Sequence, residues 1–470
     1  MRTALVAALA LVPAAAFAAG FTFPDLGARQ LGRGGTGTAT GGEVGALYYN
    51  PGALIGDDGW HVQLDAMVSR EQVGFQRVNA KGSPGGYGAV ANSGGAFADT
   101  LSGISYTNTR VALPFALAFG IYGPSSTGNL EYPDPALVPT PSSQDACDHA
   151  CHVDHDAPQR YSLISENLVV VFPTLALSVR PLSWLDVGAA YSVRYSHIEN
   201  TLAIYGGPLA GLGSDFDARA VIKATDGGWR LVLGALARPI PGLSIGLSGH
   251  LKEGTSGAGT LDITLPPIAA QVHQSVRGDS ISLAYTYDPE VRAAARYAWS
   301  DFSLELDGVY EGWSAMDSIY LITHDVNIVT KNGDTETVKP VQSIPLKKNW
   351  HDAYSGRLGF EWQPRQGALT VRAGALAETS AVPTSTLSVD FPAWERAGGT
   401  LGAEYRFANG MSVVVAYEHL ASPDTKVRDS QVKQATADPS VTPDVVGNGN
   451  YTASLDYFSA GFGFSFGGTK

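Results

Sequence analysis

The chain has 470 residues, of which 44 are acidic and 31 basic, and its formal net charge is −13. This negative charge argues against nucleic acid as a partner, because phosphate backbones bind basic surfaces. Charged residues make up only 16% of the chain and aromatic residues 10%, whereas ordinary globular domains are about 25% charged. Together with a neutral mean hydropathy, this composition is typical of membrane β-barrels, whose strands alternate apolar and small polar residues.

The first 18 residues predict a cleaved secretory signal peptide. Arg2 provides the positive start, an apolar core follows, and Ala16-Phe17-Ala18 is an A-x-A cleavage site. The core is too short for a membrane anchor. No later run reaches the roughly 18 apolar residues of a spanning helix, which excludes a helical membrane protein. We therefore expect export in a bacterium to an oxidising compartment, with a mature chain that begins at Ala19.

Residues 19–58 are glycine-rich and lack a long alternating pattern, so they form either a disordered tail or a plug. The bulky apolar residues of ALYYNPGALIG, residues 46–56, favour a plug, or hatch. Gly32, Gly34 and Gly37 have the spacing of a dinucleotide-binding turn, but that turn needs a strand before it and a helix after it. Neither flank fits, so we interpret these glycines as irregular backbone packed against a barrel wall.

From residue 59 onward, apolar and small or polar residues alternate along most of the chain. The last strand, YFSAGFGFSF (457–466), puts phenylalanine at almost every second position, a row that would aggregate in water but is favourable against lipid. Such a terminal strand is also what barrels present to the assembly machinery. The predicted strands are 59–71, 101–108, 110–123, 159–179, 184–198, 228–239, 242–254, 286–298, 301–313, 349–363, 367–378, 393–407, 410–421 and 453–466.

These segments predict an all-β fold, a fourteen-stranded antiparallel transmembrane β-barrel over residues 59–470 with the hatch of residues 19–58 in its lumen. Short connections, such as 238–242 and 407–410, largely alternate with long ones, such as 124–158 and 314–348. This alternation is typical of a barrel with periplasmic turns and extracellular loops, and it is hard to explain for a soluble sandwich.

Two further motifs have alternative interpretations. Gly242 to Gly246 match the G-x-S-x-G of lipases, but Ser244 stands in the middle of an alternating strand, which favours a small residue lining the lumen over a nucleophile. The segment 145–158 favours a local disulfide at the tip of an outside loop, and a weak metal site remains an alternative. The cysteines of this segment are Cys147 and Cys151, and its histidines are His149, His152 and His155.

Several arginines share the predicted lumen face of their strands. Arg194 lies on the same face of its predicted strand as Asp186 and Ser192, and Arg357 lies on the same face as Ser355. A luminal cation pairs with wall or plug carboxylates, or it meets an anionic ligand. Because an arginine fork suits a carboxylate, Arg194 and Arg357 are candidate ligand anchors.

The mature N-terminus, AGFTFPDLGARQLGRGGTGTATGGEVGALYYNPGAL (19–54), resembles that of the FadL/TodX family of outer-membrane transporters for long-chain fatty acids and aromatic hydrocarbons. The family pattern has an Asn-Pro-Ala motif, and this chain has Asn50, Pro51 and Gly52 instead, which could loosen the local turn. Further similar stretches are 117–126, 310–321, 349–362 and 371–407.

This resemblance implies a hatch-closed barrel without cofactor or catalytic residues. Hydrophobic molecules enter through extracellular loops, reach an apolar pocket near Phe21 and Phe23, and leave sideways beside a kinked third strand. Asn50, Pro51 and Gly52 would hold the hatch. The strand at 110–123 would be the kinked one, and Pro114 and Gly120 are consistent with a bend.

We therefore expect a passive transporter, a monomer in the bacterial outer membrane surrounded by its lipid. Its ligand would be a long-chain fatty acid or another hydrophobic small molecule. Two alternatives remain at this point, an outer-membrane lipase or phospholipase that uses a wall serine, and an adhesin barrel whose loops bind partners.

Overall fold

The structure is a computed structural model that describes residues 25–79, 81–84, 88–92, 96–123, 129–133, 157–205, 217–266, 268–365, 367–391, 395–434, 436 and 442–468. The predicted signal peptide, Phe21, Phe23 and the cysteine and histidine segment at 145–156 lie outside these residues. No helix among the described residues is both long and apolar enough to cross a membrane.

Fourteen antiparallel strands form a closed barrel, as the sequence predicted. The last strand pairs with the first from Trp60 opposite Phe466 to Arg77 opposite Gly449, which closes the ring. In ring order the strands are β1 (Gly59–Arg77), β4 (Leu101–Asn108), β5 (Phe115–Tyr122), β7 (Ser165–Leu182), β8 (Leu185–Ile204), β9 (Ala218–Ile240), β10 (Leu243–His250), β14 (Glu290–Trp299), β15 (Phe302–Glu311), β20 (Ala353–Trp362), β21 (Leu369–Glu378), β22 (Arg396–Arg406), β23 (Met411–Ala421) and β25 (Gly449–Phe466).

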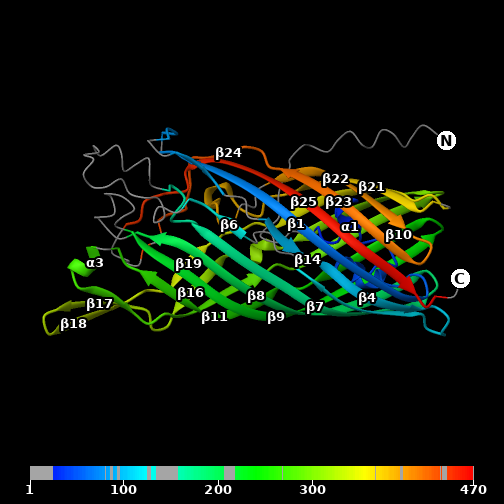
Figure 1. Cartoon of the computed structure of the whole chain (residues 1–470), viewed down its shortest axis with the longest axis horizontal. Helices are drawn as coiled ribbons and strands as arrows, with labels where there is room; N and C mark the ends of the chain where they lie inside the picture. Colours follow the sequence, from blue (N-terminus) through cyan, green and yellow to red (C-terminus); the bar gives the residue numbers. More distant parts are fainter. Residues whose placement is uncertain are drawn as a thin grey trace.

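At one end, the barrel wall continues beyond the strand ends predicted from the sequence, into segments for which the sequence predicted long loops (Figure 1). The pairing of β8 with β9, for example, runs on to Ile204 opposite Ala218. The added wall strands are β2 (Ala89–Ala91), β3 (Ala96–Asp99), β6 (Asn129–Glu131), β11 (Glu253–Thr264), β13 (Ser280–Tyr287), β16 (Ser318–Thr323), β19 (Ile344–Lys347) and β24 (Thr425–Val427). A separate sheet consists of β12 (Gln274–Arg277), β17 (Asn327–Asn332) and β18 (Thr335–Pro340).

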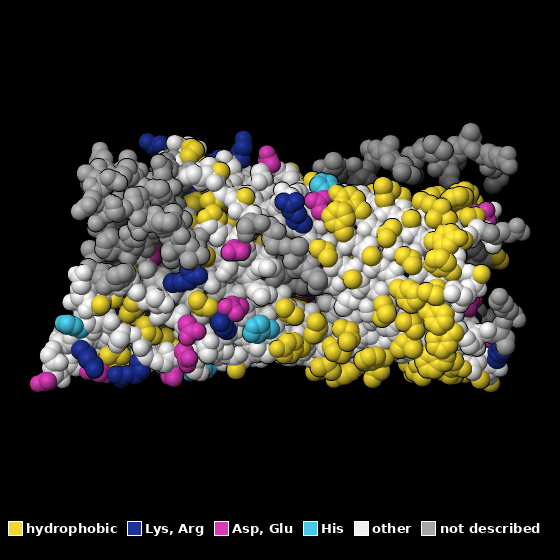
Figure 2. Space-filling view, in the orientation of Figure 1, with side chains coloured by type: hydrophobic (Ala, Val, Ile, Leu, Met, Phe, Trp, Pro, Cys, Tyr) yellow, Lys and Arg dark blue, Asp and Glu magenta, His cyan; other side chains and the backbone are white. Residues whose placement is uncertain are grey.

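The alternation of exposed and buried residues follows the predicted phases. On β15, Leu304 and Leu306 point outward and Glu305 and Asp307 point inward. Hydrophobic side chains gather over the half of the barrel with the short turns, and charged side chains over the other half (Figure 2). Among the described residues, four of the five exposed tryptophans lie next to the short turns, as in the aromatic girdles of membrane barrels. These four are Trp60, Trp184, Trp299 and Trp362, and the fifth, Trp229, lies farther along β9.

Residues 25–58, here called the luminal segment, lie inside the barrel. The segment contains α1 (Ala28–Leu31), α2 (Ala46–Tyr49) and the 3-10 turn η1 (Pro51–Ala53). Leu31, Leu47 and Tyr49 are fully buried in one cluster with inward residues of the wall, including Ala118 and Leu236. The other helices in the described part of the chain are α3 (Ile268–Gln271) and the 3-10 turns η4 (Trp313–Ala315) and η5 (Thr384–Thr386).

Candidate functional site: a charged lumen and an apolar mouth pocket

Ion pairs connect the luminal segment to the barrel wall. Arg29 on α1 lies 2.8 Å from Glu404 of β22, and Asp25 pairs with Arg357 of β20. Arg33 forms a pair within the segment, 2.6 Å from Glu43. At most 16% of any of these side chains is exposed, and removal of one partner of a buried pair leaves an uncompensated charge. The inward charges therefore hold the segment in place.

Wall carboxylates also accept hydrogen bonds from the irregular backbone of the luminal segment. Ala28 N donates to Asp65 Oδ2 at 2.9 Å, and Ala39 N donates to Glu305 at 2.7 Å. Asp307 accepts from the backbone nitrogens of residues 37 and 38. Non-helical backbone at membrane depth needs partners of this kind, because lipid and a dry lumen offer none.

Asn50, Pro51 and Gly52 form a close contact between the luminal segment and the wall. Asn50 Oδ1 accepts from Gly52 N at 3.0 Å, and its Nδ2 donates to Thr38 O at 2.7 Å and to Ala235 O at 2.9 Å. A Cβ at position 52 would stand 2.7 Å from the Cα of Ala235. The glycine that replaces the family's alanine thus permits a close approach to β9, in a turn closed by Asn50.

The other glycines of the segment lie where their backbone meets a wall strand or a ring. Gly34, with φ of 74°, lies against β21, where a Cβ on Gly374 would approach Gly34 N to 2.3 Å. Gly32 faces Gly402 of β22, and Gly37 faces the ring of Tyr49. Paired glycines on the segment and the wall allow two backbones to approach more closely than side chains would permit.

Arg194 and Arg357, the two predicted ligand anchors, are both buried and engaged with protein carboxylates. Arg194 lies 3.1 Å from Asp226 and 3.2 Å from Glu253, and its guanidinium stands 4.2 Å above the ring of Tyr287. Arg357 pairs with both Asp25 and Glu378. An incoming ligand would have to displace these carboxylates, so a role as anchors stays a prediction.

The predicted third strand, 110–123, begins later than expected. Pro114 precedes β5 and its carbonyl accepts a hydrogen bond from Arg180 N at 2.9 Å. Proline has no N–H to donate to the ladder, which is consistent with a strand that begins at Phe115. Gly120 lies within regular pairing, between Gly103 and Thr174, where a Cβ would meet Leu47 of the luminal segment at 2.6 Å.

Ser244, in the lipase-like motif, is the second residue of β10, opposite Arg296 of β14 and at a register shift against β9. The strand continues without interruption to His250. The strand-turn-helix that a nucleophile elbow requires is therefore replaced by a continuous strand at this position.

An apolar pocket of about 440 Å³, here called the mouth pocket, lies inside the extended wall, at the end of the barrel opposite the short turns. The inward positions of β8 change character along the strand, from Asp186, Ser192 and Arg194 to Leu202 and Ile204. Neighbouring strands do the same, so that the pocket has a wall of branched aliphatic side chains. Residues of this wall include Ile198, Ile222, Leu261, Leu283 and Leu321.

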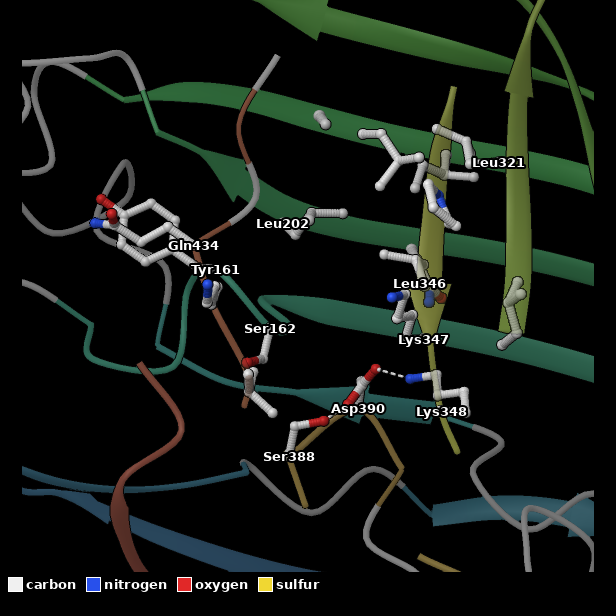
Figure 3. A pocket seen from close by; sticks show the side chains of 18 of the residues that line it. Tyr161, Ser162, Leu202, Leu321, Leu346, Lys347, Lys348, Ser388, Asp390 and Gln434 are labelled. Atoms are coloured by element: carbon white, nitrogen blue, oxygen red, sulfur yellow. Dashed lines mark hydrogen bonds and ion pairs between the residues drawn. The ribbon is translucent and has the colours of Figure 1, made fainter. Parts of the chain in front are cut away.

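Three lysines line this pocket, Lys347, Lys348 and Lys433, and Figure 3 shows the first two together on one side of it. Lys347 and Lys433 are exposed and have no ion pair among the residues that the structure describes. Lys348 is buried, 2.9 Å from Asp390 Oδ2, and its Nζ lies 4.2 Å above the ring of Phe391. An apolar cavity with cations at its edge suits a molecule with a long hydrophobic part and a negative end.

Tyr161 lines the same pocket from another side, beside an ion pair of Arg160 with Asp217 at 2.8 Å. The Tyr161 hydroxyl donates to Asp217. Burial, with the nearby Asp217 carboxylate, raises the pKa of Tyr161. This side of the pocket therefore offers a neutral phenol at physiological pH.

The pocket residues were not among the candidates chosen from the sequence. The local signal is weak, because Leu202 and Leu283 each have an alanine on one side and Leu321 lies between Tyr320 and Ile322, and the sequence predicts loops for these segments. Their pairing in the extended wall brings the three leucines to one cavity.

Comparison with known proteins agrees with the motifs quoted above. Residues 245–466 match the model of the family described as outer membrane protein transport protein (OMPP1/FadL/TodX). No curated protein is similar enough in sequence to count as a relative.

Solved structures share the fold at low sequence identity. A FadL homologue from Pseudomonas aeruginosa is 16% identical, with a TM-score of 0.69 over 96% of this chain and 100% of that one. The toluene transporter TodX of P. putida is 15% identical, with a TM-score of 0.63 over 94% and 99%. The toluene transporter TbuX of Ralstonia pickettii is 13% identical, with a TM-score of 0.60 over 94% of this chain and 99% of that one. Residues 245–466 of this chain are therefore similar to the OMPP1/FadL/TodX outer-membrane transport proteins, in agreement with the resemblance of the sequence motifs, and its barrel has the fold of a FadL homologue.

Proposed function

We propose that this outer-membrane protein takes up long-chain fatty acids, which it captures in the mouth pocket from outside. The observation that carries the proposal is the pocket itself, about 440 Å³ of largely apolar cavity with Lys347 and Lys433 at its edge. That volume lies within the range of about 300–1,000 Å³ of small-molecule sites. A fatty acid has the matching chemistry, a flexible hydrocarbon tail and one carboxylate.

The physical argument concerns the tail. Each methylene that leaves water gains roughly 0.8 kcal/mol, so a water-filled pore would serve a fatty acid poorly. An apolar pocket at the mouth collects the tail. The luminal segment acts as the hatch and keeps water from passing. Sideways exit into lipid, beside the third strand, then avoids a return of the tail to water.

Aromatic hydrocarbons are the second candidate, because two of the structurally similar proteins are toluene transporters. Toluene has no charge to place at the lysines, whereas the apolar wall would accept it equally well. Since apolar pockets discriminate weakly between hydrophobic ligands, the lysines are the feature that favours the fatty acid.

The test is uptake of labelled oleate and labelled toluene by cells with and without the protein. We expect oleate uptake to depend on the protein and to fall at least tenfold in Leu283→Glu, which places a carboxylate in the apolar wall. Ala284→Glu is the matched control, because Ala284 is the next residue of β13 and faces outward. If only toluene uptake depends on the protein, the transported ligand is an aromatic hydrocarbon and not a fatty acid. If uptake of neither depends on the protein, the proposal is refuted.

A further inference from the structure

The loop between β21 and β22 forms one side of the mouth pocket. In residues 386–390 the side chains alternate between two environments. Thr386, Ser388 and Asp390 line the pocket, whereas Leu387 and Val389 are buried on the opposite side. The buried pair packs in one cluster with inward residues of the wall, Val73 and Phe75 of β1 and Tyr451 of β25. A ligand in the pocket therefore touches one side of this loop, and the inner wall touches the other.

Both ends of this loop are tied to the luminal segment. Glu378 is the last residue of β21 and Arg396 the first residue of β22, and the two form a salt bridge. Glu378 also pairs with Arg357, which holds Asp25. The loop thus stands between the pocket and the ion pairs that fix the luminal segment.

One residue, Lys348, makes several of the contacts that hold the loop. Its ammonium lies 2.9 Å from Asp390 and above the ring of Phe391, and its carbonyl accepts from Thr386 Oγ1 at 3.1 Å. Figure 3 shows the Lys348–Asp390 pair at the edge of the cavity. The Lys348 side chain is 9% exposed, so its charge depends on a carboxylate partner.

We propose that the loop of residues 384–391 is a gate between the mouth pocket and the luminal segment, and that the carboxylate of an amphipathic ligand opens it by replacing Asp390 at Lys348. This inference rests on the proposed uptake of fatty acids. When Asp390 leaves alone, a buried ammonium loses its partner, which is strongly unfavourable. When a ligand carboxylate takes its place, Lys348 stays paired and Asp390 moves into water with the loop. A neutral hydrophobic ligand fills the same pocket but offers no replacement, so the gate stays closed.

The test compares oleate with oleyl alcohol, which has the same tail and no charge, on the purified full-length protein. In a background of Cys147→Ser and Cys151→Ser, Val389→Cys reports the opening, because residue 389 is only 2% exposed. We expect oleate to accelerate maleimide labelling of this cysteine at least fivefold and oleyl alcohol to leave it unchanged. Ala353→Cys, equally buried but on β20, is the control that neither ligand should expose.

Substitutions at the ion pair separate the roles of the two partners. Lys348→Met should weaken oleate binding roughly tenfold or more, since a hydrogen bond to a charged group is lost, and should leave oleyl alcohol binding unchanged. Lys348→Arg should restore the preference for oleate. Asp390→Asn should make the Val389→Cys site label rapidly without ligand. Lys331→Met, on the separate sheet at β17, is the matched removal of an exposed lysine.

The outcomes distinguish the gate from the transport function. Equal acceleration by oleate and oleyl alcohol, or an oleate affinity that Lys348→Met does not change, would overturn the exchange of carboxylates. An unlabelled Val389→Cys in protein that still takes up oleate would overturn the gate alone. If cells take up no oleate, the proposed function itself fails, whatever the labelling shows.

Discussion

The contact of Gly52 with β9 offers a sharp test of how the luminal segment is held. In Gly52→Ala the new Cβ would stand 2.7 Å from the Cα of Ala235 and 2.8 Å from its nitrogen. Both atoms belong to the backbone of a barrel strand, which cannot move aside as a side chain can. The 3-10 turn η1 would therefore have to withdraw from the wall. This is a strong prediction because alanine is the residue of the family motif that the sequence resembles.

Two effects set the free-energy cost of this substitution. Overpacking costs about 1–3 kcal/mol, and withdrawal loses the hydrogen bond that Asn50 donates to Ala235 O of the wall, worth about 1 kcal/mol. A total of about 2–4 kcal/mol raises the population of the undocked segment about 30- to 1,000-fold. The barrel itself should stay folded, since its ladder is unchanged.

Hydrogen exchange of the amides between residues 38 and 55 measures this undocking, and ion conductance in planar bilayers measures its effect on the seal. Gly356→Ala is the matched control, because a Cβ there meets nothing within 4 Å. We expect faster exchange and higher conductance only for Gly52→Ala. If the two variants behave alike, the reasoning from close approach is wrong.

Three further predictions concern the same wall. Arg357→Met leaves Asp25 buried without its partner, so we expect the luminal segment to lose about 3–5 kcal/mol of docking stability. Limited proteolysis of that segment in an intact barrel measures this loss, and unchanged resistance to the protease would contradict it. Asp307→Ala removes the acceptor of two backbone N–H groups, and exchange at residues 37 and 38 should quicken while Ser303→Ala, on the same strand, leaves it unchanged. Leu306→Arg places a cation on a lipid-facing position that is 60% exposed, so the free energy of unfolding in lipid should fall by about 2–4 kcal/mol. Thr260→Arg, on the outward face of the extended wall, is the control that should leave this free energy unchanged.

The fold was predictable because lipid imposes a simple rule on every membrane strand. Residues such as Leu304 and Leu306 must be apolar, and their neighbours Glu305 and Asp307 must not face lipid. The extended wall could not be predicted in the same way, because its outward side chains face water and not lipid. Beyond His197, β8 has Glu199 facing water and Leu202 facing inward, so the apolar face changes sides. A search for lipid-facing strands stops at this change.

The contacts of the luminal segment were only partly predictable. Its glycines indicated close approach to a wall, but their partners, such as Gly374 for Gly34, are fixed by the register of distant strands. The partners of Arg194 and Arg357 depended on the same register, since Asp226 and Asp25 are far from them in the sequence. The mouth pocket could not be predicted because its residues come from many of the extended strands.

The change of sides along the wall explains why a tail would not pass straight through. In the outer part of the barrel the apolar residues face inward, and Leu202, Leu283 and Leu321 give a tail a continuous surface. Nearer the short turns the inward side chains are Glu305, Asp307 and their neighbours, which bind the luminal segment. A tail that advanced along the axis would have to replace these charged contacts with methylenes, at several kcal/mol for each buried charge left unpaired. In that part of the barrel the apolar surface lies on the outside, facing lipid. For the proposed fatty acid we therefore expect the path of lowest free energy to leave the lumen sideways, near the level at which the apolar surface changes sides.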